Sequence, residues 1–495
     1  MSKILTIAVR FWWLWLSLAV LATYFITMLL SIGQSIWFDE SYSIMLARRP
    51  VGELVGLAAV DVHPPLYYLK LKAWGEIFGW SEFSLRSLSA IFAALTVGVV
   101  FFIVKKLFTI RTALVTLPFL VIAPFALRYG YEVRMYALAG LIGALATLVL
   151  IYAVRNKKNY ILWAIYAVLV ASGMYTVYMM VALFVAHFVW LMIHAIKHKE
   201  KIYQQKWLYA YVGAVVLFLP WLPTFISQTI QSALPGIGYE LTFEKIGYAL
   251  SMVISYTPES QITGWLTLGL LFVLITSIYL MAVAHRKMPP AQRTYIWLVV
   301  VLAVVPISFF ALLSLIGNPV FINRYLAPIA IYYYMFISVA IALGWRYGKR
   351  ITSLLLAAVS LFMLLGGVIQ LQSFGNFNFE RWQQPRTAEA RESISCGEDT
   401  VVVADDPYTY IDSHYYFSDC DLRFYRDYAV SNAGGYAPLH GSPTRVASST
   451  ELASKELVHL TWKGSQASFV PDERYQLVQS TTYDKQVIDQ YEKVD

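Results

Sequence analysis

Acidic and basic side chains gather at three places in the first 140 residues, each beside a long apolar run. Asp39 and Glu40 follow the first apolar run, and Arg86 begins the second. Glu132 and Arg134 lie in a polar hairpin between the third and the fourth. A carboxylate can remove the proton of an attacking hydroxyl group, and an arginine can hold a phosphate through two parallel hydrogen bonds. These residue types therefore suit group transfer from a phosphate-bearing donor.

Aromatic and basic residues accompany these charges. Tyr42 follows the acidic pair, and the segment D-V-H-P-P-L-Y-Y brings His63 and Tyr67 later in the same loop. Tyr136 closes the polar hairpin, in which Arg128 is expected to reach lipid phosphates, and Arg324 precedes a late apolar run. His63 stands before two prolines, which suit the first turn of a helix, so a structural role and a ligand role are equally expected for it.

The composition indicates that a membrane protein must position these residues. Hydrophobic residues make up 58% of the 495-residue chain and charged residues 14%, whereas about a quarter of the residues of a soluble domain are charged. The mean hydropathy of +0.58 excludes a water-soluble enzyme. The net charge of +8 lies in short basic clusters between apolar runs, where it orients the chain in the membrane rather than binding nucleic acid.

Eleven apolar runs have about the length needed to cross a bilayer. If the N-terminus is inside, the inner loops hold 18 Lys and Arg residues, whereas the outer loops at 34–82, 227–261 and 317–324 hold six. The positive-inside rule then places everything after Leu371 on the outer side. The expected spans are 11–33, 83–104, 112–129, 135–154, 160–176, 178–196, 207–226, 262–284, 294–316, 325–345 and 351–371.

Two apolar segments need separate interpretation. Residues 11–33 are too long for a signal peptide and lack a small-residue cleavage site, so we expect them to remain as an anchor. Residues 243–257 are too short to span and carry a lysine, which favours an interfacial or re-entrant helix in the outer leaflet.

The character of the chain changes near residue 373, where apolar runs shorten and VVVADD, LRFY and HLTW resemble short strands. We predict a transmembrane domain at 1–372 and a soluble α/β or α+β domain at 373–495 on the extracytoplasmic side. Cys396 and Cys420 both lie in the second domain. We expect them to form a disulfide worth about 3 kcal/mol, with two buried thiols as the alternative.

The outer membrane face restricts the donor. Nucleotide sugars are absent outside the cytoplasm, so a sugar donor there must be anchored in the membrane, and an aromatic-lined cleft between spans would hold its polyprenyl tail. A transporter would instead place polar groups at the midplane on broken helices, with internal symmetry between halves. A sensor whose C-terminal domain binds a ligand is a third hypothesis, although eleven spans are excessive for an anchor.

Six sequence segments carry a family resemblance when taken in order. They are D-E-S-Y at 39–42, H-P-P-L-Y-Y at 63–68, R-S-L-S at 86–89, P-F-A-L-R-Y-G-Y-E-V-R-M-Y at 124–136, P-W-L-P at 220–223 and R-Y-L at 324–326. With them, residues 1–375 resemble the GT-C glycosyltransferases of the family 39 type, which include protein O-mannosyltransferases and bacterial aminoarabinose transferases. Many relatives carry T-H-Y at the outer end of the fifth span, where this chain reads Y-T-V-Y at 175–178.

The resemblance implies a role for each group of residues. Asp39 would be the catalytic carboxylate, with Glu40 as its companion and Glu132 as the third acid of the site. The donor phosphate would be bound by Arg86, Arg134, Tyr136 and Arg324, and the acceptor or the cleft would involve His63, Tyr42 and Tyr67. His63, Asp39 and Glu132 could also bind a divalent cation through nitrogen and oxygen. No cofactor is certain.

The expected fold is a polytopic α-helical membrane protein of the GT-C type, in the plasma membrane of a prokaryote. It would transfer a hexosyl or pentosyl group from a polyprenyl-phosphate-linked sugar to a glycan, lipid or protein acceptor outside the cytoplasm. We expect an inverting single displacement with Asp39 as base, at a site surrounded by membrane lipids. The alternative is a transporter or flippase for a lipid-linked or small polar substrate.

Overall fold

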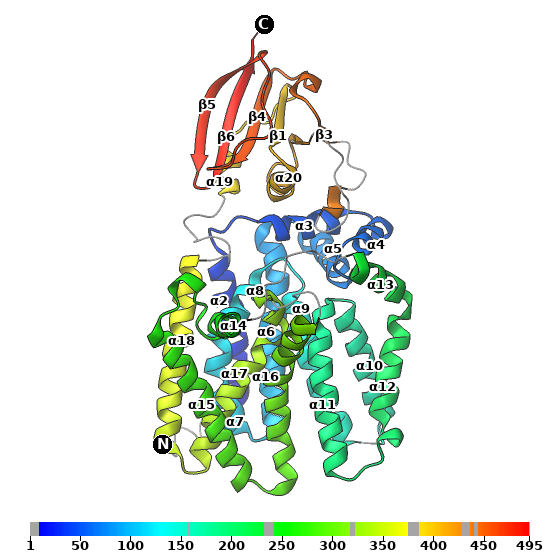
Figure 1. Cartoon of the computed structure of the whole chain (residues 1–495), viewed down its shortest axis with the longest axis vertical. Helices are drawn as coiled ribbons and strands as arrows, with labels where there is room; N and C mark the ends of the chain where they lie inside the picture. Colours follow the sequence, from blue (N-terminus) through cyan, green and yellow to red (C-terminus); the bar gives the residue numbers. More distant parts are fainter. Residues whose placement is uncertain are drawn as a thin grey trace. The chain divides into compact units, whose positions relative to one another are not determined.

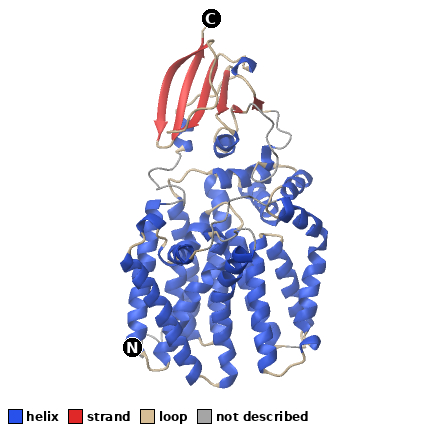
Figure 2. Cartoon of the chain, viewed as in Figure 1, coloured by secondary structure: helices blue, strands red, loops and turns tan. Residues whose placement is uncertain are grey.

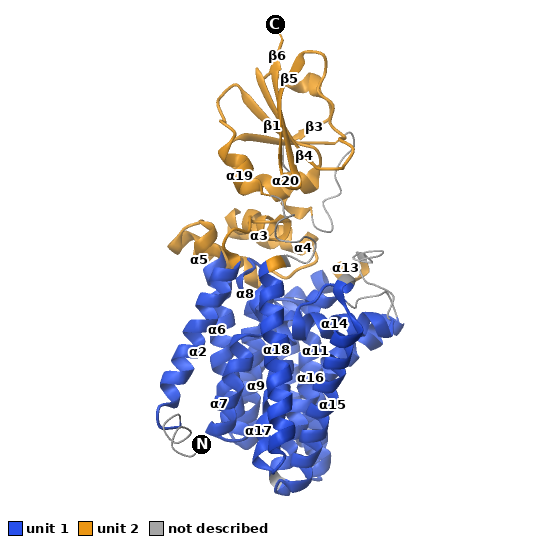
Figure 3. Cartoon of the chain, turned by 90° about the vertical axis from the view of Figure 1, so that its left-hand side faces the viewer, with its two compact units in different colours: residues 1–30, 86–226, 233–372 blue, residues 31–85, 227–232, 373–495 orange. Residues whose placement is uncertain are grey.

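The computed structural model describes residues 9–156, 158–231, 242–316, 322–374, 386–426, 436–439 and 444–494, and most of them form helices (Figure 1, Figure 2). They divide into two compact units, coloured separately in Figure 3. The first comprises residues 1–30, 86–226 and 233–372, and the second comprises residues 31–85, 227–232 and 373–495. The last boundary between the units falls where the composition changes in the sequence.

The first unit is a helical bundle whose long helices are apolar. Its helices are α2 (Trp12–Ser31), α6 (Glu82–Leu107), α7 (Ile110–Val121), α8 (Pro124–Tyr131), α9 (Tyr136–Arg155), α10 (Tyr160–Met174), α11 (Val181–Lys197), α12 (Lys206–Phe218), α13 (Leu222–Gln231), α14 (Phe243–Ser255), α15 (Gly264–Lys287), α16 (Pro290–Ile316), α17 (Ala330–Arg346) and α18 (Arg350–Phe374), of which α2, α6, α13 and α18 have one end in the second unit. In the described part of the chain, nine predicted runs become helical segments long and apolar enough to cross a membrane. The polytopic helical class is therefore confirmed.

Two predicted spans are not among these nine segments. The run at 112–129 is broken into α7 and α8, which meet at an angle of 62°. Pro124 occupies the first turn of α8, and Ala123 before it is extended, because a residue that precedes proline disfavours the helical conformation. The run at 160–176 forms α10, which has 15 residues and packs between α9 and α12.

A buried hydrogen-bond network joins several helices of the first unit. His187 on α11 contacts the Thr147 hydroxyl on α9 at 2.9 Å and the Tyr166 hydroxyl on α10 at 3.0 Å. Thr147 in turn lies 2.7 Å from the Tyr332 hydroxyl on α17, and Tyr166 lies 3.0 Å from the Tyr211 hydroxyl on α12. The network satisfies polar groups that burial would otherwise penalise, so we interpret His187 as a structural residue.

The second unit contains a mixed sheet of six strands. Its strands are β1 (Thr400–Ala404), β2 (Asp421–Tyr425), β3 (Arg445–Val446), β4 (Glu456–Trp462), β5 (Tyr475–Tyr483) and β6 (Gln486–Lys493). The strand order is β3-β2-β1-β4-β6-β5, and β1 pairs in parallel with both β2 and β4, whereas β6 runs antiparallel to β4 and β5. The three strands expected from the sequence are thus confirmed as β1, β2 and β4.

Short helices and one covalent bond complete the second unit. The helices are α3 (Phe38–Arg48), α4 (Val51–Val60) and α5 (Leu66–Phe78) from the first loop, with α19 (Thr387–Glu392) and α20 (Pro407–His414) beside the sheet. Cys396 and Cys420 form a disulfide with their Cα atoms 5.3 Å apart. Because α3 packs on α20, segments more than 300 residues apart in sequence share one compact unit.

Candidate active site

The residues predicted for the site divide between the two units. The second unit carries Asp39, Glu40, Tyr42, His63 and Tyr67, and the first carries Arg86, Glu132, Arg134, Tyr136 and Arg324. The geometry of each set is described within its own unit.

Asp39 and Glu40 lie in the first turn of α3, with Trp37 at its N-cap. The positive end of the helix dipole stabilises carboxylates at this position. The Glu40 side chain is buried, with 1% of its surface exposed, whereas Asp39 is half-buried. The two neighbouring acids therefore differ in access, and Asp39 is the more accessible of the pair.

The N-terminus of α3 is attached to α20 of the C-terminal sheet domain. Phe38 stacks on Tyr408, with ring centroids 4.4 Å apart and planes 5° from parallel. Asp412 on α20 accepts a hydrogen bond from the backbone N–H of Phe38. Nearby, the Tyr416 hydroxyl donates to Glu82 at 2.6 Å and accepts from the backbone N–H of Ile36 at 2.8 Å. Contacts with the C-terminal domain thus hold the segment that carries the acidic pair.

Two titratable groups on α20 have altered pKa values. Burial raises the pKa of Asp412 to about 7, and the carboxylates of Asp406 and Glu40 act in the same direction. Burial lowers the pKa of His414 to about 4, helped by the positive charges of Arg48 and Arg49. The contact between α3 and α20 therefore favours a protonated acid and a neutral histidine.

Tyr42 and Tyr67 both contact Tyr68 and so lie in one aromatic cluster. The Tyr42 and Tyr68 ring centroids are 6.4 Å apart, and those of Tyr67 and Tyr68 are 6.1 Å apart. Tyr67 is buried, and the half-buried His63 lies in the turn between α4 and α5. Among the residues that the structure describes, no group of three or more His, Cys, Asp and Glu side chains is arranged to hold a metal ion.

The polar hairpin of the first unit is built around a buried ion pair. Arg128 on α8 lies 3.4 Å from Glu132, and each of these side chains is 2% exposed. The Arg128 guanidinium also lies over the rings of Tyr129 and Tyr131, at 5.4 and 5.1 Å. Tyr136, at the start of α9, packs edge-on against Tyr129 with centroids 4.8 Å apart. The predicted acid Glu132 is thus neutralised within its own hairpin.

Arg128 was not among the predicted site residues, because its position in the hairpin suggested a side chain that reaches lipid phosphates. The structure buries it instead. The four-residue spacing between Arg128 on α8 and Glu132 at the C-cap of that helix was the signal for this pair.

The remaining basic candidates differ in burial. Arg86, near the start of α6, and Arg134, two residues after Glu132, are 3% and 5% exposed. The backbone N–H of Arg134 donates to the Glu132 carbonyl at 2.7 Å, which fixes a tight turn. Arg324 is half-exposed at the start of a 3₁₀ helix, Asn323–Ile329. Arg86 and Arg134 are therefore largely shielded from solvent, whereas Arg324 is not.

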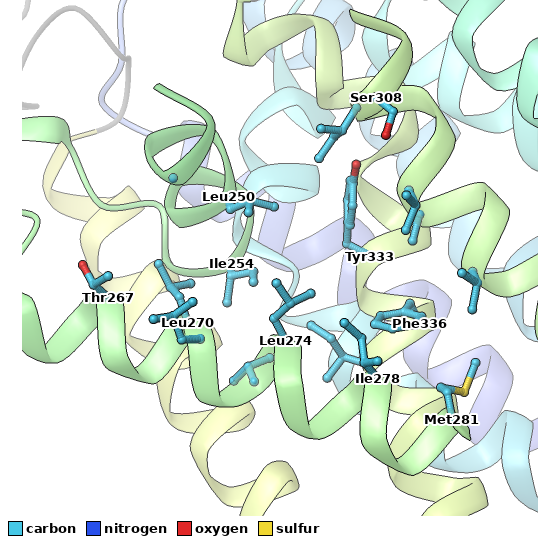
Figure 4. A pocket seen from close by; sticks show the side chains of 18 of the residues that line it. Leu250, Ile254, Thr267, Leu270, Leu274, Ile278, Met281, Ser308, Tyr333 and Phe336 are labelled. Atoms are coloured by element: carbon cyan, nitrogen blue, oxygen red, sulfur yellow. The ribbon is translucent and has the colours of Figure 1, made fainter. Parts of the chain in front are cut away.

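A large apolar cleft of about 860 Å³ lies between α14, α15, α16 and α17 in the first unit. Figure 4 shows Leu270, Leu274 and Ile278 of α15 along one side of it and Tyr333 and Phe336 of α17 on the other. Glu244 lies at the α14 end, and Arg286 lies at the far end of α15. The lining is mainly aliphatic rather than aromatic as the sequence suggested, because Leu and Ile dominate the facing sides of these helices.

Similar solved structures identify this arrangement. ArnT from Cupriavidus metallidurans in the apo state matches with a TM-score of 0.60 and 13% identity over 96% of this chain and 97% of that chain. The chain has the GT-C fold. ArnT bound to undecaprenyl phosphate matches with a TM-score of 0.61 and 12% identity, and the match covers 96% of this chain and 98% of that chain. The Archaeoglobus fulgidus oligosaccharyltransferase in complex with Zn and sulfate matches with a TM-score of 0.52 and 11% identity. This match covers 89% of this chain and 67% of that chain.

The sequence comparisons support the GT-C fold over part of the chain. Residues 62–223 match the model of the dolichyl-phosphate-mannose-protein mannosyltransferase family. No curated protein sequence matches. The predicted resemblance to GT-C glycosyltransferases is confirmed, and the chain is an integral membrane protein.

Proposed function

We propose that the chain is a membrane glycosyltransferase that moves a sugar from a polyprenyl-phosphate donor to an acceptor on the extracytoplasmic side of a prokaryotic plasma membrane. The observation that carries the proposal is the GT-C fold shared from end to end with ArnT, which has been solved with undecaprenyl phosphate bound. The match of residues 62–223 to a mannosyltransferase family supports the same reaction class.

Asp39 is the proposed base of an inverting single displacement. In that step the acceptor oxygen bonds to the anomeric carbon, the bond to the donor phosphate breaks, and Asp39 takes the acceptor proton. The half-buried position of Asp39 at the start of α3 is compatible with an arriving acceptor, whereas the burial of Glu40 suits a supporting role.

Arg86 and Arg134 are proposed to bind the leaving phosphate, with Tyr136 and Arg324 as further contacts. The two buried guanidiniums would stabilise the negative charge that develops on the phosphate as its bond to the sugar breaks. The apolar cleft beside α15 is the proposed site of the prenyl tail, since a chain of isoprene units gains free energy from such a lining.

Transfer by single-site variants tests this proposal. Asp39→Asn keeps the shape of the side chain and removes its basicity, so transfer should fall by roughly 100-fold or more. Glu40→Gln should cost less, and Asp399→Asn, an exposed acid of the sheet domain, should leave transfer unchanged. The products are measured by mass spectrometry of surface glycans and polyprenyl-phosphate sugars, with and without the gene.

Two results would contradict the mechanism. Near-normal transfer by a folded Asp39→Asn protein would exclude the base, and retention of the anomeric configuration would exclude the single displacement. If the gene is deleted and no glycan or lipid-linked sugar changes, the transferase proposal itself fails.

A further inference from the structure

The C-terminal sheet domain contains a polar pocket of about 380 Å³. Three tyrosines, Tyr408, Tyr425 and Tyr436, line it together with Arg426 and the acidic pair Asp405 and Asp406. The three tyrosines and Arg426 are half-buried, so their side chains lie at a surface that a solute can reach. The volume falls in the range of pockets that bind small molecules.

The topology of the sheet places this pocket where open α/β sheets bind ligands. From β1 the chain passes through α20 to β2 on one side, and later returns to β4 on the other side of β1. The carboxyl ends of parallel strands form a crevice at such a switch point, and ligands bind there. Asp405 follows the end of β1 and Arg426 follows the end of β2, so the pocket lies at this edge.

The carboxylates of the pocket are held in fixed positions by the surrounding backbone. Asp405 accepts hydrogen bonds from the backbone N–H groups of Ser468 at 2.8 Å and Phe469 at 2.9 Å, and it contacts His459 at 3.1 Å. Asp406 accepts from the backbone N–H of Thr409 at 2.9 Å. A carboxylate has about four acceptor positions, so Asp406 retains acceptor capacity in a preorganised geometry.

The mixture of side chains favours one ligand class. Two carboxylates beside one guanidinium disfavour a phosphate or another anion, because like charges repel. An extended peptide binds along a strand edge or a groove, whereas this pocket is compact and lies at the strand ends. A neutral sugar ring presents hydroxyl groups that both donate to carboxylates and accept from arginine, and its C–H face packs against tyrosine rings.

We propose that this pocket binds a sugar ring, and, resting on the proposed function, that the ring belongs to a carbohydrate acceptor. The second part follows from the neighbourhood of Asp39. Tyr408, which lines the pocket, stacks on Phe38, and Tyr436 meets Phe38 edge-on with centroids 6.3 Å apart. Asp39 is the next residue in the chain, so a glycan held in the pocket lies beside the proposed base within the same compact unit.

Saturation-transfer NMR on the full-length protein in nanodiscs tests the binding site without a transfer assay. Nanodiscs avoid sugar-headed detergents, and the probes are D-glucose, D-galactose, D-mannose, N-acetyl-D-glucosamine and the peptide Gly-Ser-Thr-Asn. We expect saturation to be transferred from the protein to the ring protons of at least one sugar and not to the peptide. Arg426→Ala should weaken binding by about tenfold or more through loss of charge-assisted hydrogen bonds.

Matched variants separate this proposal from the proposed function. Lys455→Ala also removes one positive charge, but at an exposed residue just before the amino end of β4, and should keep the signal. Asp39→Asn should also keep it, because the pocket and not the base holds the sugar. Three results would overturn the pocket assignment: no saturation-transfer signal from any of the four sugars, an unchanged signal in Arg426→Ala, or a signal from the peptide alone. Each of them would leave the transferase proposal standing.

Discussion

Each of the two units buries one carboxylate that was predicted for the site, and the two carboxylates act on different kinds of group. In the first unit, Glu132 is paired with Arg128 from the preceding helical turn. In the second unit, the charge of Glu40 acts on Asp412 and, after burial, helps to raise the pKa of that carboxyl group, although Asp412 comes from a helix more than 360 residues later in the chain. Glu132 is thus paired with a cation from its own hairpin, whereas the charge of Glu40 acts on an acid from the C-terminal domain.

This difference separates local from long-range control of a charged site. The hairpin pair needs only α8 and its C-cap residue to form, since Arg128 and Glu132 are four residues apart in sequence. The α3 acids depend on the C-terminal domain, because Tyr408 and Asp412 hold the first turn of α3. Changes in the hairpin should therefore act through charge, and changes at α20 should act through the attachment of α3.

Breaking the ion pair between Arg128 and Glu132 should have the largest effect on the stability of the protein. Glu132→Gln leaves the Arg128 guanidinium buried without its counter-charge, and we expect a loss of about 3 kcal/mol or more in stability. Glu76→Gln is the matched control, because Glu76 pairs with Lys72 at the same spacing at 2.6 Å but is 54% exposed. The control should change stability by less than about 1 kcal/mol.

Thermal unfolding of the solubilised protein followed by tryptophan fluorescence measures both variants. Equal shifts for Glu132→Gln and Glu76→Gln would show that the Arg128 pair is not electrostatically isolated from solvent.

Loss of the disulfide should have the next largest effect on stability, and this effect should be confined to the second unit. Replacing Cys396 and Cys420 together with serine releases a loop with a sequence separation of 24, at a cost of about 3 kcal/mol. Proteolysis of the sheet domain should accelerate, while the hairpin of the first unit keeps its hydrogen-exchange protection. Two thiols that react in the unreduced, unfolded wild-type protein would contradict the bond.

The attachment of α3 should depend on pH through two opposing groups. Burial raises the pKa of Asp412 to about 7, so the folded protein keeps a proton that the unfolded chain loses near pH 4. The contribution of Asp412 to the free energy of unfolding is therefore complete below about pH 4 and is lost as the pH rises to about 7. His414, with its pKa lowered to about 4, stays neutral where the unfolded chain is protonated. Its effect is present above pH 6.5 and is lost as the pH falls to 4.

Asp412→Asn removes the first effect and leaves the second. The stability of the variant should rise more steeply between pH 4 and 6.5 than that of the wild type, by up to about 1.4 kcal/mol per pH unit. Parallel profiles of melting temperature against pH would show that Asp412 titrates normally in the folded protein.

The smallest effect concerns the aromatic stack that joins α3 to α20. A double-mutant cycle with Phe38→Ala and Tyr408→Ala should give a coupling energy of about 1 kcal/mol. Hydrogen exchange of the α3 amides measures it, and the cycle Trp74→Ala with Phe78→Ala, a pair within α5, provides a local comparison. A coupling near zero for Phe38 and Tyr408 would mean that other contacts hold α3.

The sequence predicted what depends on short segments of chain. Spans are local, since about 20 apolar residues suffice to identify one, and the three parallel strands could be recognised as short runs of β-branched and aromatic residues. The break at Ala123 was also encoded, because Pro124 marks it.

Other features depended on contacts that no local pattern carries. Nothing near Asp39 indicates that Tyr408 and Asp412 will pack against its helix. Arg128 was misread because its hairpin resembles a membrane interface, where arginine often reaches lipid phosphates. The pocket beside Arg426 requires the ends of separate strands to meet, which only the sheet order supplies.

Residues 31–85 and 373–495 belong to one compact unit but are synthesised at different times. The Tyr416 hydroxyl binds the backbone of Ile36 across 380 positions of the chain. At a synthesis rate of about 5–20 residues per second, the segment with the acidic pair leaves the ribosome roughly 20 to 80 seconds before its partner does. During that interval α3 lacks the surface that covers Phe38. The nascent chain must therefore complete its C-terminal domain before its first loop can reach its native packing.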